Sequence, residues 1–110
     1  MTLGNKQMLE ARKDFAVRYF FYIIDNGQII PDEEGSECSD LDAAKEEAKA
    51  SALDLARQAI HRGWRPTTIC VEIQDGEGRV LSALKVQEIF EHPRRPIFDK
   101  ACAQTNQPRQ

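Results

Sequence analysis

The clearest pattern in the chain is a run of aromatic and β-branched residues that ends in a tight turn. Six such residues occupy positions 19–24, a composition typical of a β-strand. Asp25-Asn26-Gly27 follows, and Asn-Gly supplies two residues that tolerate a positive φ. The sequence therefore predicts a hairpin whose second strand covers 28–30. Pro31 lacks an amide donor, so it marks the end of that strand or an edge of the sheet.

Small apolar residues then recur at helical spacing. They form one stripe of an amphipathic helix: Leu41, Ala44, Ala48, Ala52, Leu55 and Ala59. Ser39 or Asp40 caps its start, acidic residues gather in its first half and basic residues at its end, and Pro66 prevents its resumption. A stripe of alanines permits close approach to a sheet but contributes little buried area.

The second half of the chain predicts another hairpin. Strict alternation over 68–74 places Ile69, Val71 and Ile73 on one face of a strand, a turn follows at 75–78, and 79–86 is a fourth strand. We expect a β-β-α-β-β order and an α+β fold, with an antiparallel-type four-stranded sheet and one amphipathic helix packed on one face. This single domain spans 18–90. Residues 1–17 are expected to be an extension, either a tail or a short helix, and 91–110 a C-terminal tail that is largely extended or disordered.

Several short motifs resemble a small bacterial domain-of-unknown-function family. They are Arg18-Tyr19-Phe20-Phe21, Asp25-x-Gly27, Pro31-Asp32-Glu33-Glu34-Gly35, the helix start Asp40-Leu41-x-Ala43-Ala44, Val71-Glu72-Ile73-x-Asp75 and Gly78-Arg79-Val80-Leu81. The resemblance covers about Arg18 to Val86. It implies a compact α+β domain and no established activity.

One departure from that family suggests an assembly face. The family commonly has polar residues at the positions of Tyr22 and Ile24, whereas here Phe20, Tyr22 and Ile24 form an apolar row opposite the helix-facing row. A lone helix covers one face of a sheet, so the second face needs another cover. We expect either a second copy, which makes the protein a homodimer, or the terminal extensions. The candidate covering residues of those extensions are Phe15, Ile89, Phe90, Ile97 and Phe98.

Composition limits the classes of partner and compartment. The 110 residues are 30% charged with a formal net charge of -3, which disfavours a general affinity for nucleic acid. No apolar stretch approaches the roughly 20 residues that span a bilayer, and the first twenty residues lack a secretory pattern. Three cysteines, Cys38, Cys70 and Cys102, stand in unrelated contexts, so we expect no disulfide framework and a cytoplasmic location.

Potential catalytic and metal-binding groups are few. Asp32, Glu33 and Glu34 read as a solvated turn, with weak binding of a hard cation left open. Cys38, Cys70 and the two histidines, His61 and His92, lack the short ligand pairs of a zinc site. Cys70 is expected to pack within its strand, and the alternative is a nucleophile paired with His61 or His92. We expect His61 to act as a cation at the end of the helix.

A second candidate site is basic. Five residues make up a candidate patch for an anion or nucleic acid: Arg62, Trp64, Arg65, Arg94 and Arg95. The simpler interpretation is that they belong to a solvated helix end and a proline-stiffened tail.

The sequence carries no nucleophile elbow and no phosphate-cradling glycine loop, and it predicts no catalytic residue, cofactor or metal. We expect a non-catalytic protein-binding or self-assembling module, a homodimer through Phe20, Tyr22 and Ile24. The alternative is an antitoxin-like regulator, similar in architecture to the antitoxins of Hic-type systems, that binds a toxin partner or nucleic acid.

Overall fold

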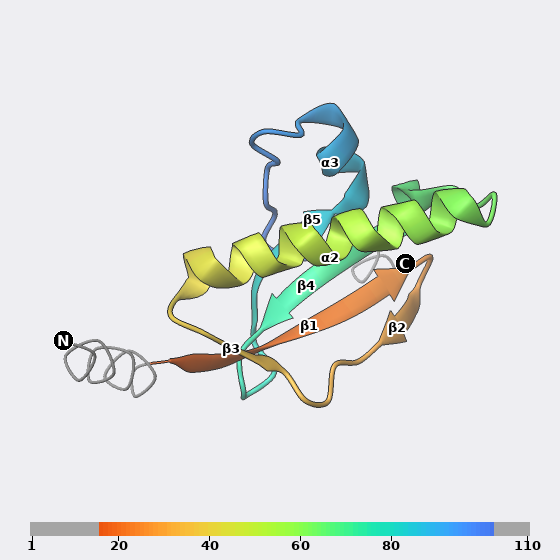
Figure 1. Cartoon of the computed structure of the whole chain (residues 1–110). Coiled ribbons are helices and arrows are strands. Elements are labelled where there is room, and N and C mark those ends of the chain that lie inside the picture. The colour runs from red at the N-terminus through yellow and green to blue at the C-terminus, as the bar shows by residue number, and fades with distance from the viewer. Residues whose placement is uncertain (1–15, 103–110) are drawn as a thin grey trace, which may run out of the picture.

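The structure, a computed structural model, describes residues 16–102 of the chain. Its elements follow the order β1 (Val17–Asp25), β2 (Gln28–Ile30), β3 (Ser36–Cys38), α2 (Leu41–His61), the 3-10 helix η1 (Pro66–Thr68), β4 (Ile69–Gln74), β5 (Val80–Lys85) and α3 (Val86–Glu91). Figure 1 shows the long helix α2 lying across one face of the sheet. The predicted α+β fold is confirmed, with one more strand than the sequence indicated.

The sheet is antiparallel and is built around β1. Its strand order is β2-β1-β4-β5, and β3 pairs separately with the first residues of β1. Asp25 lies opposite Gln28 and Asn26 has a φ of 55°, as the predicted hairpin requires. The extra strand, β3, was not predicted, because its three residues carry no apolar alternation. β3 pairs with β1, which is distant in sequence, and the pattern of polar and apolar residues within β3 does not indicate this partner.

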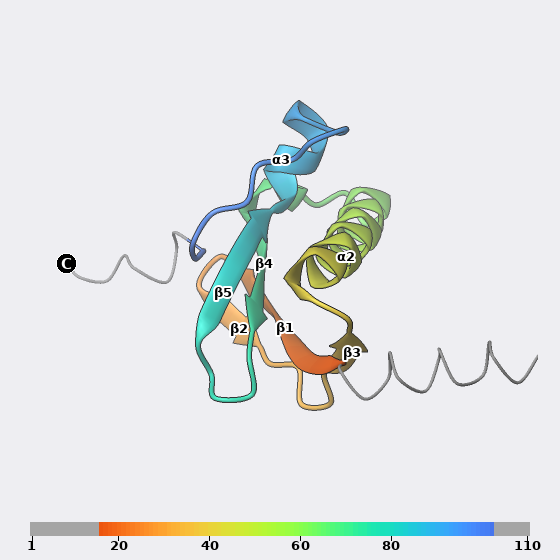
Figure 2. The same cartoon turned by 90° about the vertical axis from the view of Figure 1, so that its left-hand side faces the viewer.

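Helix α2 sits close to the sheet because its inner surface is made of alanines. Ala44, Ala48, Ala52, Ala56 and Ala59 are all buried. They share one cluster with Val71 and Ile73 of β4 and Leu84 of β5. Asp40 is the N-cap, and its Oδ1 accepts the backbone N–H of Ala43 at 2.9 Å. Figure 2 shows the helix standing on one side of the sheet only.

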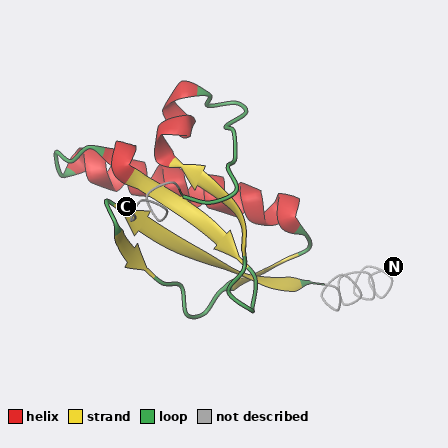
Figure 3. Ribbon diagram, turned by 180° about the vertical axis from the view of Figure 1, so that it is seen from behind, coloured by secondary structure: helices red, strands yellow, loops and turns green. Residues whose placement is uncertain are grey.

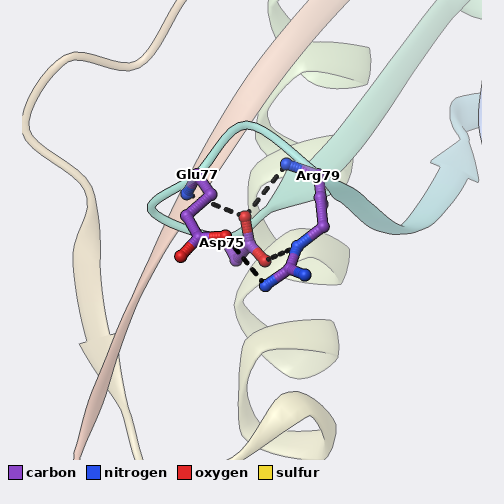
Figure 4. A network of polar contacts seen from close by, with 3 residues as sticks. All are labelled: Asp75, Glu77 and Arg79. Atoms are coloured by element: carbon purple, nitrogen blue, oxygen red, sulfur yellow. Dashed lines mark hydrogen bonds and ion pairs between the residues drawn. The ribbon is translucent and has the colours of Figure 1, made fainter.

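The turn between β4 and β5 is organised by one carboxylate (Figure 4). Asp75 Oδ1 accepts the backbone N–H groups of Glu77 and Arg79, both at 2.9 Å, and Asp75 Oδ2 accepts the Arg79 Nε–H at 2.8 Å. These bonds, the backbone N–H of Arg79 first, hold the pKa of Asp75 below its usual value. The turn is therefore fixed by charge-assisted hydrogen bonds rather than by packing.

The region after β5 differs from the predicted strand end. Val86 begins α3 instead of ending a strand, and it is buried. Ile89 and Phe98 pack against the cluster between α2 and the sheet, whereas Phe90 and Ile97 are exposed. A six-residue helix carries too few residues to show a periodic pattern, so its docking, not its sequence, stabilises it.

The expectation that no disulfide forms is wrong. Cys70 of β4 is bonded to Cys102, 32 residues further along the chain, while Cys38 is free and buried. Sequence spacing gave no indication of this pair, because only the return of the chain past β5 brings Cys102 to the sheet.

Candidate functional site

The most distinctive surface of the fold is the sheet face opposite α2, called here the outer face (Figure 3). Phe20, Tyr22 and Ile24 of β1 lie on it, directly across from Gln74, Glu72 and Cys70 of β4 respectively. Because side chains alternate along a strand, Tyr19, Phe21 and Ile23 point to the helix side and join the main core there. The predicted division of β1 into two apolar rows is thus present in the structure.

The C-terminal segment covers one end of the outer face. Residues 99–102, called here the strap, begin at Asp99, which exchanges two backbone hydrogen bonds of 2.8 Å with Ala83 of β5. The strap ends at Cys102, whose backbone N–H donates to Glu72 Oε2 at 3.1 Å and whose sulfur is bonded to Cys70. Ile24 is only 1% exposed as a result, in a small cluster with Cys70, Ala83 and Cys102.

This arrangement corrects two expectations. Ile24 is not available as an assembly residue while the strap is in place. The strap does come from a terminal extension, but its covering residue is Cys102 rather than the aromatic and branched residues expected. Of those, Ile89 and Phe98 lie on the helix side, and Phe15 lies outside the described residues.

The other end of the outer face stays open. Phe20 and Tyr22 are half-buried and line a hollow of about 390 Å³ together with Asp32, Glu33 and the β4–β5 turn. Gln74 of β4 lies between Phe20 of β1 and Val80 of β5 across the sheet. The side chains of Val80 and Leu81 are 37% and 39% exposed. We call Phe20, Tyr22 and Val80 the apolar patch.

The acidic loop forms one rim of this hollow, and Asp32 organises it. The Asp32 carboxylate accepts the backbone N–H groups of Phe21 at 3.0 Å, Gly35 at 3.1 Å and Glu34 at 3.3 Å. Gly35 has a φ of +72°, and a Cβ there would lie 2.9 Å from the Phe20 ring. The Asp-Glu-Glu-Gly motif therefore acts as a folded clamp against β1, and its aspartate oxygens are engaged in backbone hydrogen bonds.

The structure separates the basic candidates into two groups. Arg62 stacks over Trp64 at 5.2 Å from the ring centre, and Trp64 and Arg65 line a hollow of about 400 Å³ at the C-terminal end of α2. Arg94 and Arg95 line another hollow with Asp42, Lys45, Glu46 and Lys49 of the first half of α2. At 1.5 Å per residue, positions 46 and 62 lie about 24 Å apart along the helix. The five residues do not form a single patch.

The cysteines and histidines do not assemble into a nucleophilic or zinc site within the described part of the chain. Cys70 has no free thiol, which removes it as a nucleophile in this form. Burial, with smaller contributions from Glu47 and Asp40, raises the pKa of the Cys38 thiol and keeps it protonated. His61 is exposed in the last turn of α2.

A group that sequence reasoning missed lies at the end of α3. Potential ligand atoms of Glu88, Glu91 and His92 lie within 4.8 Å of one another, and of the residues described they alone form such a set of three. The Glu-x-x-Glu-His spacing on a helix could have indicated it. Glu88 Oε1 already accepts the Ile97 N–H at 3.0 Å, and Glu91 Oε2 accepts Gln87 Nε2 at 2.7 Å. Both bonds fix the chain around α3.

Within residues 16–102, no helix has the length and apolar character needed to cross a membrane. No curated protein matches the chain, and no solved structure matches it. A family model described as a domain of unknown function, DUF6894, matches residues 18–87. This range begins at the second residue of β1 and ends at the second residue of α3, so it contains the sheet and α2 but stops before the strap. The chain belongs to the DUF6894 family.

Proposed function

We propose that this protein is a non-catalytic binding module that assembles as a homodimer through the apolar patch of its outer face. The observation that carries the proposal is the pair of half-buried aromatics, Phe20 and Tyr22, on a sheet face that no helix of residues 16–102 covers. Aromatic side chains are enriched in the buried centres of protein interfaces, because they remove much apolar area at little cost in conformational entropy.

A second copy is a suitable occupant because the patch lies on a sheet surface. Two such faces related by a two-fold axis present the same residues to each other, as most soluble homodimers do. The acidic rim of the hollow disfavours nucleic acid as a partner. Asp32, Glu33 and Asp75 line the hollow beside the patch, and their negative charges repel the phosphates of nucleic acid.

The test is the oligomeric state of the purified full chain, measured by sedimentation velocity over a concentration series. We expect a dimer for the wild type and a monomer for Tyr22→Asp, which places a charge in the centre of the interface. Leu53→Asp is the matched control, because Leu53 is 38% exposed on α2, on the other side of the sheet. A monomeric wild type, or equal dimerisation of Tyr22→Asp and wild type, overturns the proposal. Circular dichroism checks that each variant is folded.

One observation favours the antitoxin-like alternative. Trp64 is 59% exposed beside Arg62 and Arg65, a combination that suits stacking on a base or on an arginine of a partner. It is the single tryptophan of the chain, so its fluorescence reports the site directly. This alternative requires salt-dependent quenching of Trp64 by a single-stranded oligonucleotide. An unchanged spectrum at low salt eliminates the nucleic-acid form of the alternative.

A further inference from the structure

The strap and the disulfide divide the apolar row of β1 into a covered and an open part. Ile24 is sealed beneath Cys102, while Phe20 and Tyr22, four and two residues earlier, are half-buried. The sealed cluster of Ile24, Cys70, Ala83 and Cys102 is separate from the main core between α2 and the sheet. Opening the strap therefore uncovers apolar surface without disturbing the packing of the helix.

The strap is held by noncovalent contacts as well as by the disulfide. Asp99 exchanges two backbone hydrogen bonds with Ala83, its carbonyl accepts the Ser82 hydroxyl at 3.5 Å, and its side chain forms a 3.8 Å ion pair with Lys85. The Cys102 N–H donates to Glu72 Oε2. Asp99 and Lys100 are exposed. Ordering four residues costs conformational entropy, and the Cys70–Cys102 bond is the covalent tie that keeps the strap on the sheet.

We propose that the strap is a redox-released cover of the outer face. A dithiol reductant supplies the two electrons: its thiolate attacks one sulfur of the Cys70–Cys102 bond and forms a mixed disulfide, and its second thiol then displaces that sulfur. The products are the two protonated cysteine thiols and the oxidised, cyclic disulfide of the reductant. Both sulfurs are fully buried, so attack follows transient opening of the strap.

Release extends the apolar patch along β1 from Phe20 and Tyr22 to Ile24, with Cys70 beside it. The longer surface binds a second copy more tightly, a consequence that rests on the proposed function. In a reducing compartment the open form predominates, and in an oxidising one the closed form does. The disulfide thereby sets the size of the interface.

The primary test is amide hydrogen exchange followed by NMR, which does not depend on any partner. It uses the full chain with Cys38→Ala, so that Cys70 and Cys102 are the only thiols that dithiothreitol generates. We expect the Ala83 amide, which donates to Asp99, to exchange at least about tenfold faster after reduction. The amide of Val71 in the middle of the sheet is the internal control and keeps its protection. Equal protection of Ala83 in both forms overturns the proposal.

Cys102→Ser removes the tie without reductant, and because Cys102 belongs to the small cluster outside the main core we expect this variant to fold and to match the reduced protein. Sedimentation equilibrium of the oxidised and reduced forms then measures the consequence for assembly. Tighter dimerisation of the reduced form supports the proposal, and equal dimerisation overturns its link to assembly. If neither form dimerises, the proposed function fails, while the exchange rate of Ala83 still decides whether the strap opens.

Discussion

Replacing Gly35 by alanine tests whether the acidic loop is clamped against β1. Its φ of +72° disfavours an L-residue, and a Cβ would meet Tyr19 O, Arg18 Cγ and Phe20 Cε2, each at 2.9 Å. The left-handed conformation costs about 1–2 kcal/mol. Forcing an extra carbon into a packed contact adds about 1–3 kcal/mol. The stiffer unfolded chain recovers about 0.4–1 kcal/mol. We expect Gly35→Ala to lower the free energy of unfolding by about 2–4 kcal/mol.

Gly63→Ala separates the two causes. Gly63 has a φ of +80°, but a Cβ there would meet nothing within 4 Å, so this variant carries only the backbone cost. Urea denaturation of both variants, with a common slope, gives the two free energies. We expect Gly35→Ala to be the less stable by about 1–3 kcal/mol, which is the cost of the close approach. Equal destabilisation of the two variants refutes the clamp.

Three further substitutions test other parts of the fold. Asp40→Ala removes the N-cap bond of α2 and is expected to cost about 1 kcal/mol, or about 4–8 °C in thermal melting. Ala48→Leu overfills the fully buried contact between α2 and the sheet and is expected to cost about 1–3 kcal/mol in urea denaturation, whereas Ala50→Leu on the exposed side costs little. Asp75→Asn removes the charge that accepts the Arg79 hydrogen bonds, so it lowers the melting temperature at neutral pH.

Asp75 also carries a pH dependence whose sign follows from its lowered pKa. The pKa of the native carboxyl lies below the usual aspartate value of 3.8, so its ionisation stabilises the fold above that pH. This contribution is lost as the pH falls from about 4 through the native pKa. Melting curves across this range are expected to converge for wild type and Asp75→Asn. A constant gap between them contradicts the assignment.

For the candidate site, the sequence predicted that the side chains of β1 form two rows on opposite faces of the sheet. It did not predict how exposed each of these side chains is. Alternation alone placed Phe20, Tyr22 and Ile24 on one face, and the register with β4 agrees. That Ile24 is sealed while Phe20 and Tyr22 line a hollow depends on a segment far along the chain. The five basic-patch residues do not come together for the same reason. Trp64 lies at the C-terminal end of α2 and Arg95 beside its first half, and the local sequence around each residue does not indicate this separation.

The sequence by itself determined the elements whose stabilising contacts are local. Asn-Gly specifies the first hairpin, the alanine stripe and its Asp40 cap specify α2, and period-two alternation specifies β4, because hydrogen bonding and side-chain direction within a few residues carry this information. Only the tertiary structure decided that β3 pairs with β1, that α3 docks, and that Cys102 returns to Cys70. Each of these is a short segment stabilised by partners many residues away, and no local pattern of polar and apolar residues encodes such a partner.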